Sequence, residues 1–428
     1  RVGTPVLQRN SHAFDGAIFY FFGPLLAGGT IVLAAPGRHW DLDYLTDLIE
    51  RHKIEIDGPT PSFLRAMILS SGLAKCSSLK HLFVGGEALT PDLVALYFER
   101  GGRALLHNAY GPTETTVVVT EEGYVAPNPP KSITIGRPIR NTTALVVSRG
   151  LQLNPIGVPG ELVIGGDSVG RGYVGRPELT AEKFVPDPFA ANSGARLYRT
   201  GDLARVLRDG KIEYLGRIDD QVKLRGFRIE LGEIEAALRA IFGVSSAAVV
   251  VREDTPGQKY LAGYVASAPS DAVSPVALRA ALSATLPDYM VPTTLTVLDA
   301  LPVNTSGKLD RKALPRPEMT LEAYVAPRNP IERAIAEVFE LVLGQSEVGA
   351  TGNFFELGGH SLLAMQLLSR LRETLSMELK LREIFENPTV SALAELVSSA
   401  RSLDVAPVGA AIQVVSREAY AVGERAWA

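Results

Sequence analysis

The stretch Leu105-Leu106-His107-Asn108-Ala109-Tyr110-Gly111-Pro112-Thr113-Glu114 leads from a short apolar run into a polar turn. Ala104–Leu106 predicts a buried strand, and Gly111-Pro112 predicts a turn directly after it. The Thr113 hydroxyl beside the Glu114 carboxylate could hold phosphate oxygens and Mg²⁺, because Mg²⁺ prefers carboxylates and phosphates. A polar turn that caps a helix is the alternative, since Ser and Thr favour helix caps.

Outward from this stretch, short apolar runs alternate with helical patterns as far as about Gly201, which predicts an α/β fold. The clearest segments are the strands Ile54–Ile56, Leu82–Val84 and Leu162–Ile164 and the helix Asp43–His52. Strand signals dominate residues 143–214. A smaller α+β unit follows from about Asp219-Asp220. Its expected elements are the helices Leu231–Ile241 and Pro275–Leu286 and the strand Ala247–Val251.

Residues 329–400 are expected to be all helical, because their apolar residues recur at the 3–4 spacing. Asn329-Pro330-Ile331-Glu332 is a strong helix start, with an N-cap, a proline in the first turn and a Glu at the third helical position. Further helices are predicted at Ser361–Leu375 and Thr389–Ser399. Four prolines between Pro315 and Pro330 mark a linker. The expected divisions are 1–219, 220–316, a linker at 317–328, 329–400, and a tail or linker at 401–428.

The charge balance argues against two classes of partner. Lys plus Arg number 43 and Asp plus Glu 47, a formal net charge of −4. A nucleic-acid-binding protein is expected to be basic, so neither nucleic acid nor an anionic membrane surface is favoured. From Pro327 to Ala400 six Lys and Arg stand against ten Asp and Glu. The helical unit therefore carries the acidity, which suits docking against basic faces of partner proteins.

Cys76 is the one cysteine, so an intrachain disulfide and a cysteine-based zinc site are excluded, and a reducing cytoplasm fits. The uncharged stretch Gly16–Gly37 is long enough to cross a bilayer. Pro24 and Gly28-Gly29 interrupt it, so we expect a short buried helix, a turn and the buried strand Thr30–Ala34 instead. Because the chain lacks an initial Met and a signal peptide, we expect a cytoplasmic fragment of a longer protein.

Three further positions could carry chemistry. The Asp202 carboxylate could accept hydrogen bonds from ribose hydroxyls; a surface turn is the alternative. Lys308, in a Ser-Gly-Lys turn, could stabilise developing charge on a carboxylate or phosphate; a solvated surface lysine is the alternative. Ser361 opens a helix, whose positive end would favour a phosphate. The alternatives there are a plain N-cap and a nucleophile paired with His360, and no Gly-x-Ser-x-Gly elbow supports the pair.

Taken in order, these motifs resemble those of a nonribosomal peptide synthetase: most of an adenylation domain followed by a peptidyl carrier (thiolation) domain. The resemblance runs from about Pro5 to Ala400. It rests on Phe14-Asp15, Asn108–Glu114, Gly160–Leu162, Arg171–Tyr173, Tyr198–Leu203, Gly216–Asp219, Gln221–Gly226, Leu286–Pro292, Gly307–Arg311 and Asn353–Leu362. It implies an α/β adenylate-forming core truncated at its N-terminus, a small α+β C-terminal subdomain and an all-α four-helix carrier domain.

The resemblance implies an ATP-dependent ligase. ATP and an amino acid would give an aminoacyl-adenylate and pyrophosphate with Mg²⁺, and the acyl group would pass to the thiol of 4′-phosphopantetheine on Ser361. The implied partners are the amino acid, a phosphopantetheinyl transferase and neighbouring synthetase domains (condensation, thioesterase or ketosynthase). The family's glycine-rich phosphate loop lies upstream of the first pocket motif and this chain begins after it. Adenylation by the fragment alone therefore stays open.

Roles for single residues follow from the same resemblance. The implied roles are adenine contact for Tyr110, Tyr214 and Asn108, phosphate and Mg²⁺ binding for Thr113 and Glu114, ribose contact for Asp202 and Arg217, the adenylation-step lysine for Lys308, the hinge for Asp219 and the loop beside the pantetheine path for Gly226. A lysine that serves the first step and withdraws for the second would make a hinge-gated active site.

Asp15 matches the carboxylate that pairs with the substrate's α-amino group, which favours an amino acid over a fatty or aryl acid. The other pocket positions are all uncharged: Gly16, Phe19, Gly58, Phe83, Gly85, Ala109, Val117 and Val118. Because an unpaired charge would be costly to bury there, we expect a neutral, apolar substrate side chain of medium to large size, with the three glycines leaving room for it. Three residues depart from the family pattern: Ala17 replaces a serine, and Tyr20 and Gly352 replace acidic residues.

Two other functions stay open. Without the phosphate loop, the chain could serve only as a carrier and docking module. It could also be an acyl-CoA synthetase-like ligase with a helical tail. Asp15 and the motif around Ser361 argue against the latter, because an enzyme that passes its acyl group to CoA needs no carrier serine.

Overall fold

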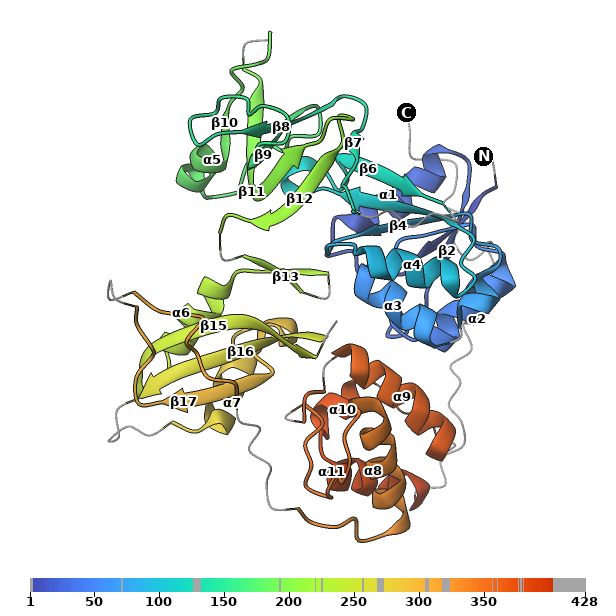
Figure 1. Ribbon diagram of the computed structural model, residues 1–428. Helices are drawn as coiled ribbons and strands as arrows, with labels where there is room; N and C mark the ends of the chain where they lie inside the picture. The colour runs from blue at the N-terminus through green and yellow to red at the C-terminus, as the bar shows by residue number, and fades with distance from the viewer. Residues whose placement is uncertain are drawn as a thin grey trace, which may run out of the picture.

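Figure 1 shows the computed structural model of the chain, in which two sheets, a smaller sheet-containing unit and a group of helices follow one another. The structure describes residues 3–402 apart from 71, 126–131, 192–193, 220, 225, 256–257, 268–272, 305–307, 318–323, 356, 360, 376, 378 and 380. Most of the predicted tail at 401–428 and half of the predicted linker at 317–328 therefore lie outside the described residues.

The N-terminal part, which we call the core, is built on a seven-stranded sheet in the order β2-β1-β3-β4-β5-β6-β7. Its strands are β1 (Pro5–Gln8), β2 (Thr30–Leu33), β3 (Ile56–Asp57), β4 (His81–Gly85), β5 (Leu105–Tyr110), β6 (Thr120–Tyr124) and β7 (Arg137–Pro138). Strands β1 to β5 are parallel, and β6 and β7 are antiparallel to their neighbours. This confirms the α/β prediction, and the parallel strands end at one edge, where such sheets bind ligands.

Three of the core helices pack on one face of this sheet. They are α2 (Leu42–His52), α3 (Pro61–Leu69) and α4 (Pro91–Glu99). Their apolar residues form one cluster with Leu82 and Val84 of β4 and Leu106 of β5. Asp41 caps α2 by accepting a 3.0 Å hydrogen bond from Tyr44 N, because an Asp side chain can satisfy a free N–H of the first turn.

Helix α1 (Gly16–Leu26) and strand β2 confirm the helix and strand predicted in the uncharged stretch, but the prediction that they are buried is wrong. Only Ala17, Tyr20 and Pro24 of α1 are buried, whereas Phe22 is 58% and Leu26 88% exposed. The reason is that β2 is an edge strand and α1 turns one narrow face toward the sheet. Among the described residues, no helix has the length and apolar character that a membrane span requires.

The second sheet of the core is made of β8 (Thr142–Val147), β9 (Gly160–Gly166), β10 (Phe184–Pro186), β11 (Arg196–Val206) and β12 (Ile212–Arg217), with the short helix α5 (Pro177–Lys183) beside them. It confirms that strands dominate residues 143–214. Leu162, Ile164 and Ala204 pack against Tyr110 and Val119 at the end of β5. The two sheets therefore meet at the end of β5.

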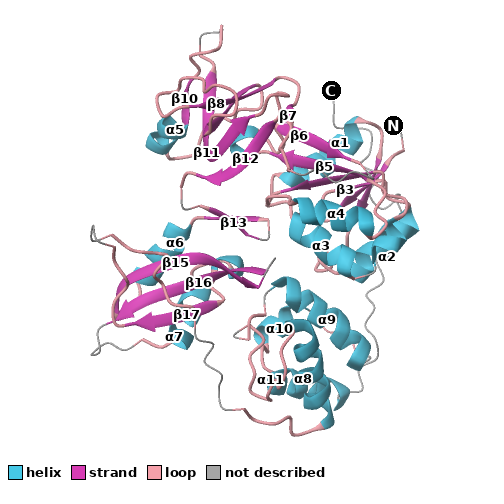
Figure 2. Cartoon of the chain, viewed as in Figure 1, coloured by secondary structure: helices cyan, strands magenta, loops and turns pink. Residues whose placement is uncertain are grey.

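The small unit begins with a hairpin of β13 (Val222–Leu224) and β14 (Phe227–Ile229), which extends toward the core in Figure 2. A three-stranded sheet follows, made of β15 (Val244–Thr255), β16 (Gln258–Ser267) and β17 (Thr294–Leu298). Helices α6 (Leu231–Arg239) and α7 (Pro275–Ser283) pack on it through one apolar cluster. Both predicted helices are present, and each ends a few residues earlier than expected.

The helical unit contains α8 (Pro330–Leu343), α9 (Ser361–Leu375), α10 (Leu381–Glu386) and α11 (Val390–Ser402). The predicted start of α8 is confirmed: Asn329 Oδ1 accepts a 2.9 Å hydrogen bond from Glu332 N. The helix ends at Gly344, whose φ of 65° suits glycine. Phe339 and Phe354 meet edge to face at 5.2 Å in the middle of the apolar cluster.

Candidate functional site

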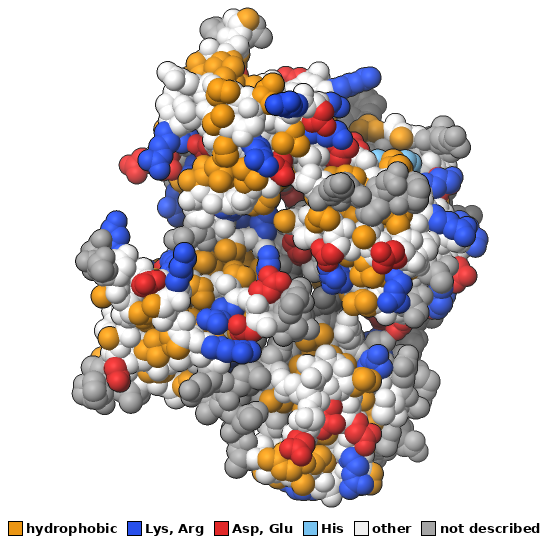
Figure 3. Space-filling model, viewed as in Figure 1, with side chains coloured by type: hydrophobic (Ala, Val, Ile, Leu, Met, Phe, Trp, Pro, Cys, Tyr) orange, Lys and Arg blue, Asp and Glu red, His pale blue; other side chains and the backbone are white. Residues whose placement is uncertain are grey.

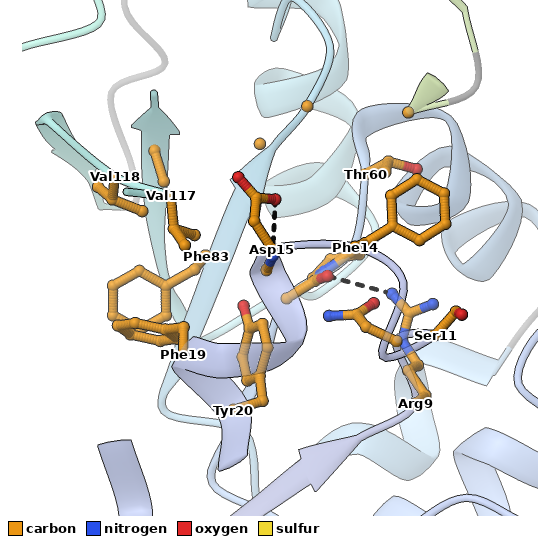
Figure 4. Close-up of a pocket in the computed structure, with 18 of the residues that line it drawn as sticks. Arg9, Ser11, Phe14, Asp15, Phe19, Tyr20, Thr60, Phe83, Val117 and Val118 are labelled. Atoms are coloured by element: carbon orange, nitrogen blue, oxygen red, sulfur yellow. Dashed lines mark hydrogen bonds between the residues drawn. The ribbon is translucent and has the colours of Figure 1, made fainter. Parts of the chain in front are cut away.

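A cavity of about 290 Å³ lies where β4, β5 and the start of α1 come together. All nine residues predicted for the amino-acid pocket line it: Asp15, Gly16, Phe19, Gly58, Phe83, Gly85, Ala109, Val117 and Val118. Figure 4 shows Phe19 and Phe83 side by side on one wall, near Val117 and Val118. The parallel strands bring these distant segments to one edge of the sheet, and this wall is apolar as predicted.

Asp15 brings a carboxylate to this cavity from the N-terminus of α1. Its Oδ1 accepts a 2.7 Å hydrogen bond from Gly16 N. No described residue donates a hydrogen bond to its other oxygen, so this oxygen is left for a ligand. A carboxylate in this position can form a charge-assisted hydrogen bond with an ammonium group.

Two of the three pocket glycines do not leave the room that was expected. A Cβ on Gly85 would lie 2.6 Å from the Ala109 carbonyl oxygen, so the backbone of the next strand fills that space. A Cβ on Gly58 would lie 1.5 Å from the Tyr20 hydroxyl oxygen, so a side chain fills it. At Gly16 the nearest atom would be 4.0 Å away, and the room is real.

The loop after β5 shapes the cavity from above the sheet edge. Strand β5 continues to Tyr110, so the strand predicted at Ala104–Leu106 was too short, and Asn108 and Ala109 lie on it. Thr113–Thr115 then form a short 3₁₀ helix. Val117 has a φ of 69°, which is unfavourable for a β-branched residue. Such strain is kept where the surrounding structure fixes it, as it does in many ligand sites.

A polar cluster surrounds Tyr110 at the junction of the two sheets. The Tyr110 hydroxyl donates a hydrogen bond to Asp202, and Arg217 donates one of 2.8 Å to the other oxygen of Asp202. Arg217 also forms a bidentate ion pair with Asp219, at 2.5 and 2.7 Å. The rings of Tyr110 and Tyr214 lie 6.4 Å apart. The structure thus brings together the residues predicted for adenine, ribose and the hinge.

Asn108, also predicted for adenine, is buried on β5 close to this cluster. Its Nδ2 donates a 2.7 Å hydrogen bond to the Thr134 carbonyl oxygen. This bond orients the amide and leaves its Oδ1 as an acceptor, which is the group that an exocyclic amine needs.

Glu114, predicted to bind Mg²⁺, is occupied by partners in this structure. Its carboxylate pairs with Arg228 of β14 at 2.7 Å and accepts a 2.7 Å hydrogen bond from the Tyr173 hydroxyl. Burial by itself would raise the pKa of Glu114, but the Arg228 charge and the Tyr173 hydroxyl hold it below its usual value. Thr113 beside it is exposed. Among the described residues, no group of three or more His, Cys, Asp or Glu could hold a metal ion.

The hairpin of the small unit closes one side of the cavity. Gly226 and Phe227 both line it, and the Phe227 ring lies edge to face against Phe14 at 5.5 Å. A Cβ on Gly226 would lie 2.8 Å from Thr60 Cγ2, and the φ of Gly226 is 81°. Glycine is therefore required at this point of the hairpin.

Two lysines of the small unit lie in different surroundings. Lys308, predicted for the adenylation step, is exposed and does not line the cavity; its N–H donates to Asn304 Oδ1 at 3.1 Å. Its neighbours Ser306 and Gly307 lie outside the described residues. Lys223 of β13 instead places its Nζ 5.2 Å from the Tyr110 ring, and burial lowers its pKa. The structure therefore brings Lys223, not Lys308, to the polar cluster.

Ser361 is the first residue of α9, as predicted, and its side chain lies outside the described part of the structure, as does His360. The other end of α9 touches the core, where Arg372 donates a 2.8 Å hydrogen bond to Asp41. Asp41 follows Trp40, which lines the cavity. On the face seen in Figure 3, Asp and Glu side chains gather over the helical unit, in agreement with its predicted acidity.

The residues that sequence analysis missed are Lys223, Arg228, Tyr20 and Phe227. Lys223 and Arg228 lie in or next to the segment Gln221–Gly226, whose charge pattern could have drawn attention to them. Tyr20 was noted only as a departure from a family pattern.

Family models match the chain in the expected order. An AMP-binding enzyme model matches residues 4–174, an AMP-binding enzyme C-terminal domain residues 233–308, and a phosphopantetheine attachment site residues 331–397. Tyrocidine synthase 3 of Brevibacillus parabrevis is 46% identical over 399 residues, which are 92% of this chain. The chain belongs to the nonribosomal peptide synthetase family.

Other synthetases agree with this assignment. A dimodular nonribosomal peptide synthase of Bacillus subtilis (strain 168) is 45% identical over 395 residues, or 91% of this chain. The chain spans only 6% of tyrocidine synthase 3 and 16% of the dimodular synthase. A solved synthetase protein with adenylation and PCP domains, in its holo form bound to a vinylsulfonamide inhibitor, superposes with a TM-score of 0.75 at 30% identity over 93% of this chain and 66% of that one. The α/β adenylate-forming core and the carrier domain are therefore both present.

Proposed function

We propose that the chain forms the part of a synthetase module that activates an amino acid as an aminoacyl-adenylate with ATP and loads it as a thioester on Ser361. The observation that carries this proposal is the union, in one chain, of three features. A carboxylate-bearing pocket lies beside the cluster of Tyr110, Asp202 and Arg217, and a phosphopantetheine attachment domain follows.

In this proposal Asp15 holds the α-amino group, because it offers an oxygen to a ligand next to apolar walls. The substrate carboxylate then points out of the pocket toward the loop of Thr113 and Glu114. Asp202 accepts hydrogen bonds from the ribose, and the Asn108 Oδ1 accepts one from the adenine amine. These contacts hold the two reactants in a fixed orientation, which is a large part of the acceleration that such enzymes achieve.

Mg²⁺ fits the site only if Glu114 is released from Arg228. Mg²⁺ in nucleotide sites is bound by one or two carboxylates together with phosphates, so one carboxylate suffices. When bound, the ion would neutralise charge on the phosphates of ATP. Because the Arg228 pair occupies Glu114, we assign this structure to the state that follows adenylation.

Two positions in the small unit support that assignment. Gly226 lines the cavity, where we propose that it borders the path of the pantetheine arm, and the exposed Lys308 is withdrawn. Rotation about Asp219 would exchange the two faces that the small unit turns toward the core, one with Lys308 and the other with Gly226. The site would then be gated by this hinge, with Lys308 present for adenylation and Gly226 for thioester formation.

The partners proposed for this module are a phosphopantetheinyl transferase and neighbouring condensation, thioesterase or ketosynthase domains. The acidic helical unit suits the basic surfaces of such partners. We propose a cytoplasmic location, since the single Cys76 is compatible with a reducing compartment.

The test is the intact mass of the chain after incubation with CoA and a broad-specificity phosphopantetheinyl transferase. We expect one pantetheine-sized increment in the wild type and none in Ser361→Ala, while Ser369→Ala on the same helix keeps the increment. No increment on a folded wild-type chain would contradict the carrier role, and the acyl-CoA synthetase-like function would then lead.

The adenylation half is tested by amino-acid-dependent exchange of pyrophosphate into ATP, on the chain extended by its upstream sequence. Asp15→Ala should abolish the exchange, because the α-amino group loses its counter-charge. Exchange that is unchanged in Asp15→Ala would contradict the proposed substrate pocket. If only the mass increment is seen, the carrier and docking function is the one that remains.

A further inference from the structure

Tyr20 occupies the part of the amino-acid pocket that Gly58 leaves open. It lies on the buried face of α1 with Ala17 and Pro24, and its side chain is turned into the cavity. Its ring meets Phe19 edge to face at 5.1 Å, and Phe19 in turn meets Phe83 at 5.4 Å. The three rings form one continuous wall, visible in Figure 4.

The Tyr20 side chain occupies the space that a side chain at position 58 would need. A Cβ on Gly58 would lie 1.5 Å from the Tyr20 hydroxyl oxygen and 2.2 Å from its Cζ. Any residue other than glycine at position 58 would therefore displace the tyrosine. The two positions depend on each other: Tyr20 of α1 forms the part of the pocket wall that Gly58, after β3, cannot form.

Tyr20 lines the cavity, and its hydroxyl has no hydrogen-bond partner among the described residues. The residue is 6% exposed, and no described residue forms a hydrogen bond with the hydroxyl. The nearby Asp57 carboxylate is already used, since its Oδ1 accepts hydrogen bonds from Gly58 N at 2.7 Å and Arg9 Nε at 3.3 Å. A hydroxyl can both donate and accept a hydrogen bond, so this one is available to a polar group of a ligand in the cavity.

The hydroxyl is also kept as a neutral donor. Burial, and then the Asp57 charge, raise the pKa of Tyr20 above its usual value. The Arg9 charge is neutralised by Asp57 in a pair whose side chains are 4% and 2% exposed. The Tyr20 hydroxyl thus adds an uncharged hydrogen-bonding group beside the apolar side chains of Phe19 and Phe83. Figure 4 shows Ser11 and Thr60 on the other side of the cavity, near Phe14.

We propose that Tyr20 determines the specificity of the pocket, and that the substrate is an amino acid whose side chain carries a neutral oxygen, a hydroxyl or an amide, which pairs with the Tyr20 hydroxyl. The inference rests on the proposed function and refines the apolar side chain expected from the sequence. A charged side chain is disfavoured, because nothing in the pocket would balance it.

The test compares isosteric pairs of aminoacyl sulfamoyl-adenosines: threonine with valine, serine with alanine, and tyrosine with phenylalanine. Their affinities for the chain are measured by titration calorimetry. We expect the wild type to prefer the oxygen-bearing member of one pair by about 100-fold or more, because a site that hydrogen-bonds a substrate hydroxyl rejects the analogue without it. Tyr20→Phe should reduce that preference to a few-fold and leave the affinity for the apolar member unchanged.

Two variants complete the design. Gly58→Ala keeps the tyrosine but displaces it, so the preference should fall as in Tyr20→Phe. Phe22→Leu, on the exposed face of α1, is the matched control and should bind like the wild type. Equal preferences in Tyr20→Phe and the wild type, or a wild type that prefers the apolar members, would overturn the inference and leave the proposed function intact.

Failure of the proposed function itself gives a different result. In that case the wild type binds none of the six compounds, or binds them equally well after Asp15→Asn. Either outcome would contradict the assignment of this cavity as an amino-acid pocket and, with it, the proposed role of Tyr20.

Discussion

The small unit and the helical unit touch the core in different ways. The hairpin of the small unit meets the core through the pair Arg228–Glu114, the packing of Phe227 on Phe14, and Lys223 over the Tyr110 ring. These contacts lie around a cavity and are of three kinds, an ion pair, a ring packed on a ring and a cation over a ring; the side chains of the ion pair are 35% and 12% exposed. The helical unit meets the core through the ion pair Arg372–Asp41, whose side chains are 21% and 11% exposed.

The two kinds of contact suit different functions. Several contacts of different kinds fix the hairpin in one geometry, which a loop that borders an active site needs. A partly exposed ion pair holds two units with modest energy and is weakened by salt. A carrier that has to visit several partners is served by the second kind of contact. The following variants test this comparison, in order of decreasing expected effect.

The largest effect is expected inside the core, at the polar cluster around Tyr110. Asp202 is 1% exposed and accepts hydrogen bonds from both Arg217 and the Tyr110 hydroxyl. Asp202→Ala leaves a buried guanidinium and a buried hydroxyl short of a partner, so we expect a loss of about 3 kcal/mol in the free energy of unfolding. Urea unfolding followed by circular dichroism measures it. Asp202→Asn keeps the shape and an acceptor and should lose clearly less; equal losses would mean that the charge alone carries the effect and that the shape and the acceptor contribute nothing.

Only the family resemblance assigned the residues of that cluster to one nucleotide, whereas sequence patterns indicate the local elements on which they lie. Tyr110 ends a strand, and Asp202 and Arg217 face each other across paired antiparallel strands. The apolar periodicity likewise gave the α/β core, the strand-rich region and the start of α8. The bounds of β5 were missed, since the polar residues His107 and Asn108 interrupt its apolar run although they are buried.

Contacts between distant segments could not be predicted in this way. Gly58 appeared to leave room because its neighbour Tyr20 comes from another element, 38 positions away in the sequence. The location of Lys308 depends on how the whole small unit is oriented against the core, which no local pattern encodes. Arg372 and Asp41 are 331 positions apart, and neither lies in a recognisable motif.

The second prediction concerns the hairpin. Arg228→Ala should favour detachment of the hairpin from the core by about 1 kcal/mol, roughly fivefold in population, because the ion pair with Glu114 is lost. The effect is modest because Arg228 is partly exposed. Faster tryptic cleavage between β12 and β14 would measure the opening. Arg239→Ala, on the surface of the same unit, is the control and should be cleaved like the wild type. Equal cleavage of all three proteins would contradict the anchoring role.

The same pair gives this hairpin a pH dependence of known sign. Because the pKa of Glu114 is lowered in the folded chain, the pair is fully formed at pH values above the usual carboxyl pKa of 4.5 and is lost as the pH falls through the lowered value. The hairpin of the wild type should therefore begin to detach from the core below pH 4.5 and be fully detached below the lowered pKa of Glu114, where cleavage by pepsin approaches that of Arg228→Ala. Glu114→Gln should be open already at neutral pH.

The smallest effect is expected at the contact of the helical unit. Asp41→Asn removes the charge that Arg372 needs but keeps the cap of α2, because Asn and Asp cap helices equally well. The free energy of unfolding should change by less than about 1 kcal/mol. The radius of gyration from small-angle X-ray scattering should nevertheless increase, and 0.5 M NaCl should produce the same increase in the wild type by screening the pair.

Asp47→Asn provides the matched control for this contact. It removes the same charge from the same helix, but its partner is Lys75 within the core. Its scattering should equal that of the wild type at low salt. If Asp41→Asn also scatters like the wild type at both salt concentrations, the ion pair does not hold the helical unit. The contrast between a fixed hairpin and a lightly held carrier would then need another contact of α9 to explain it.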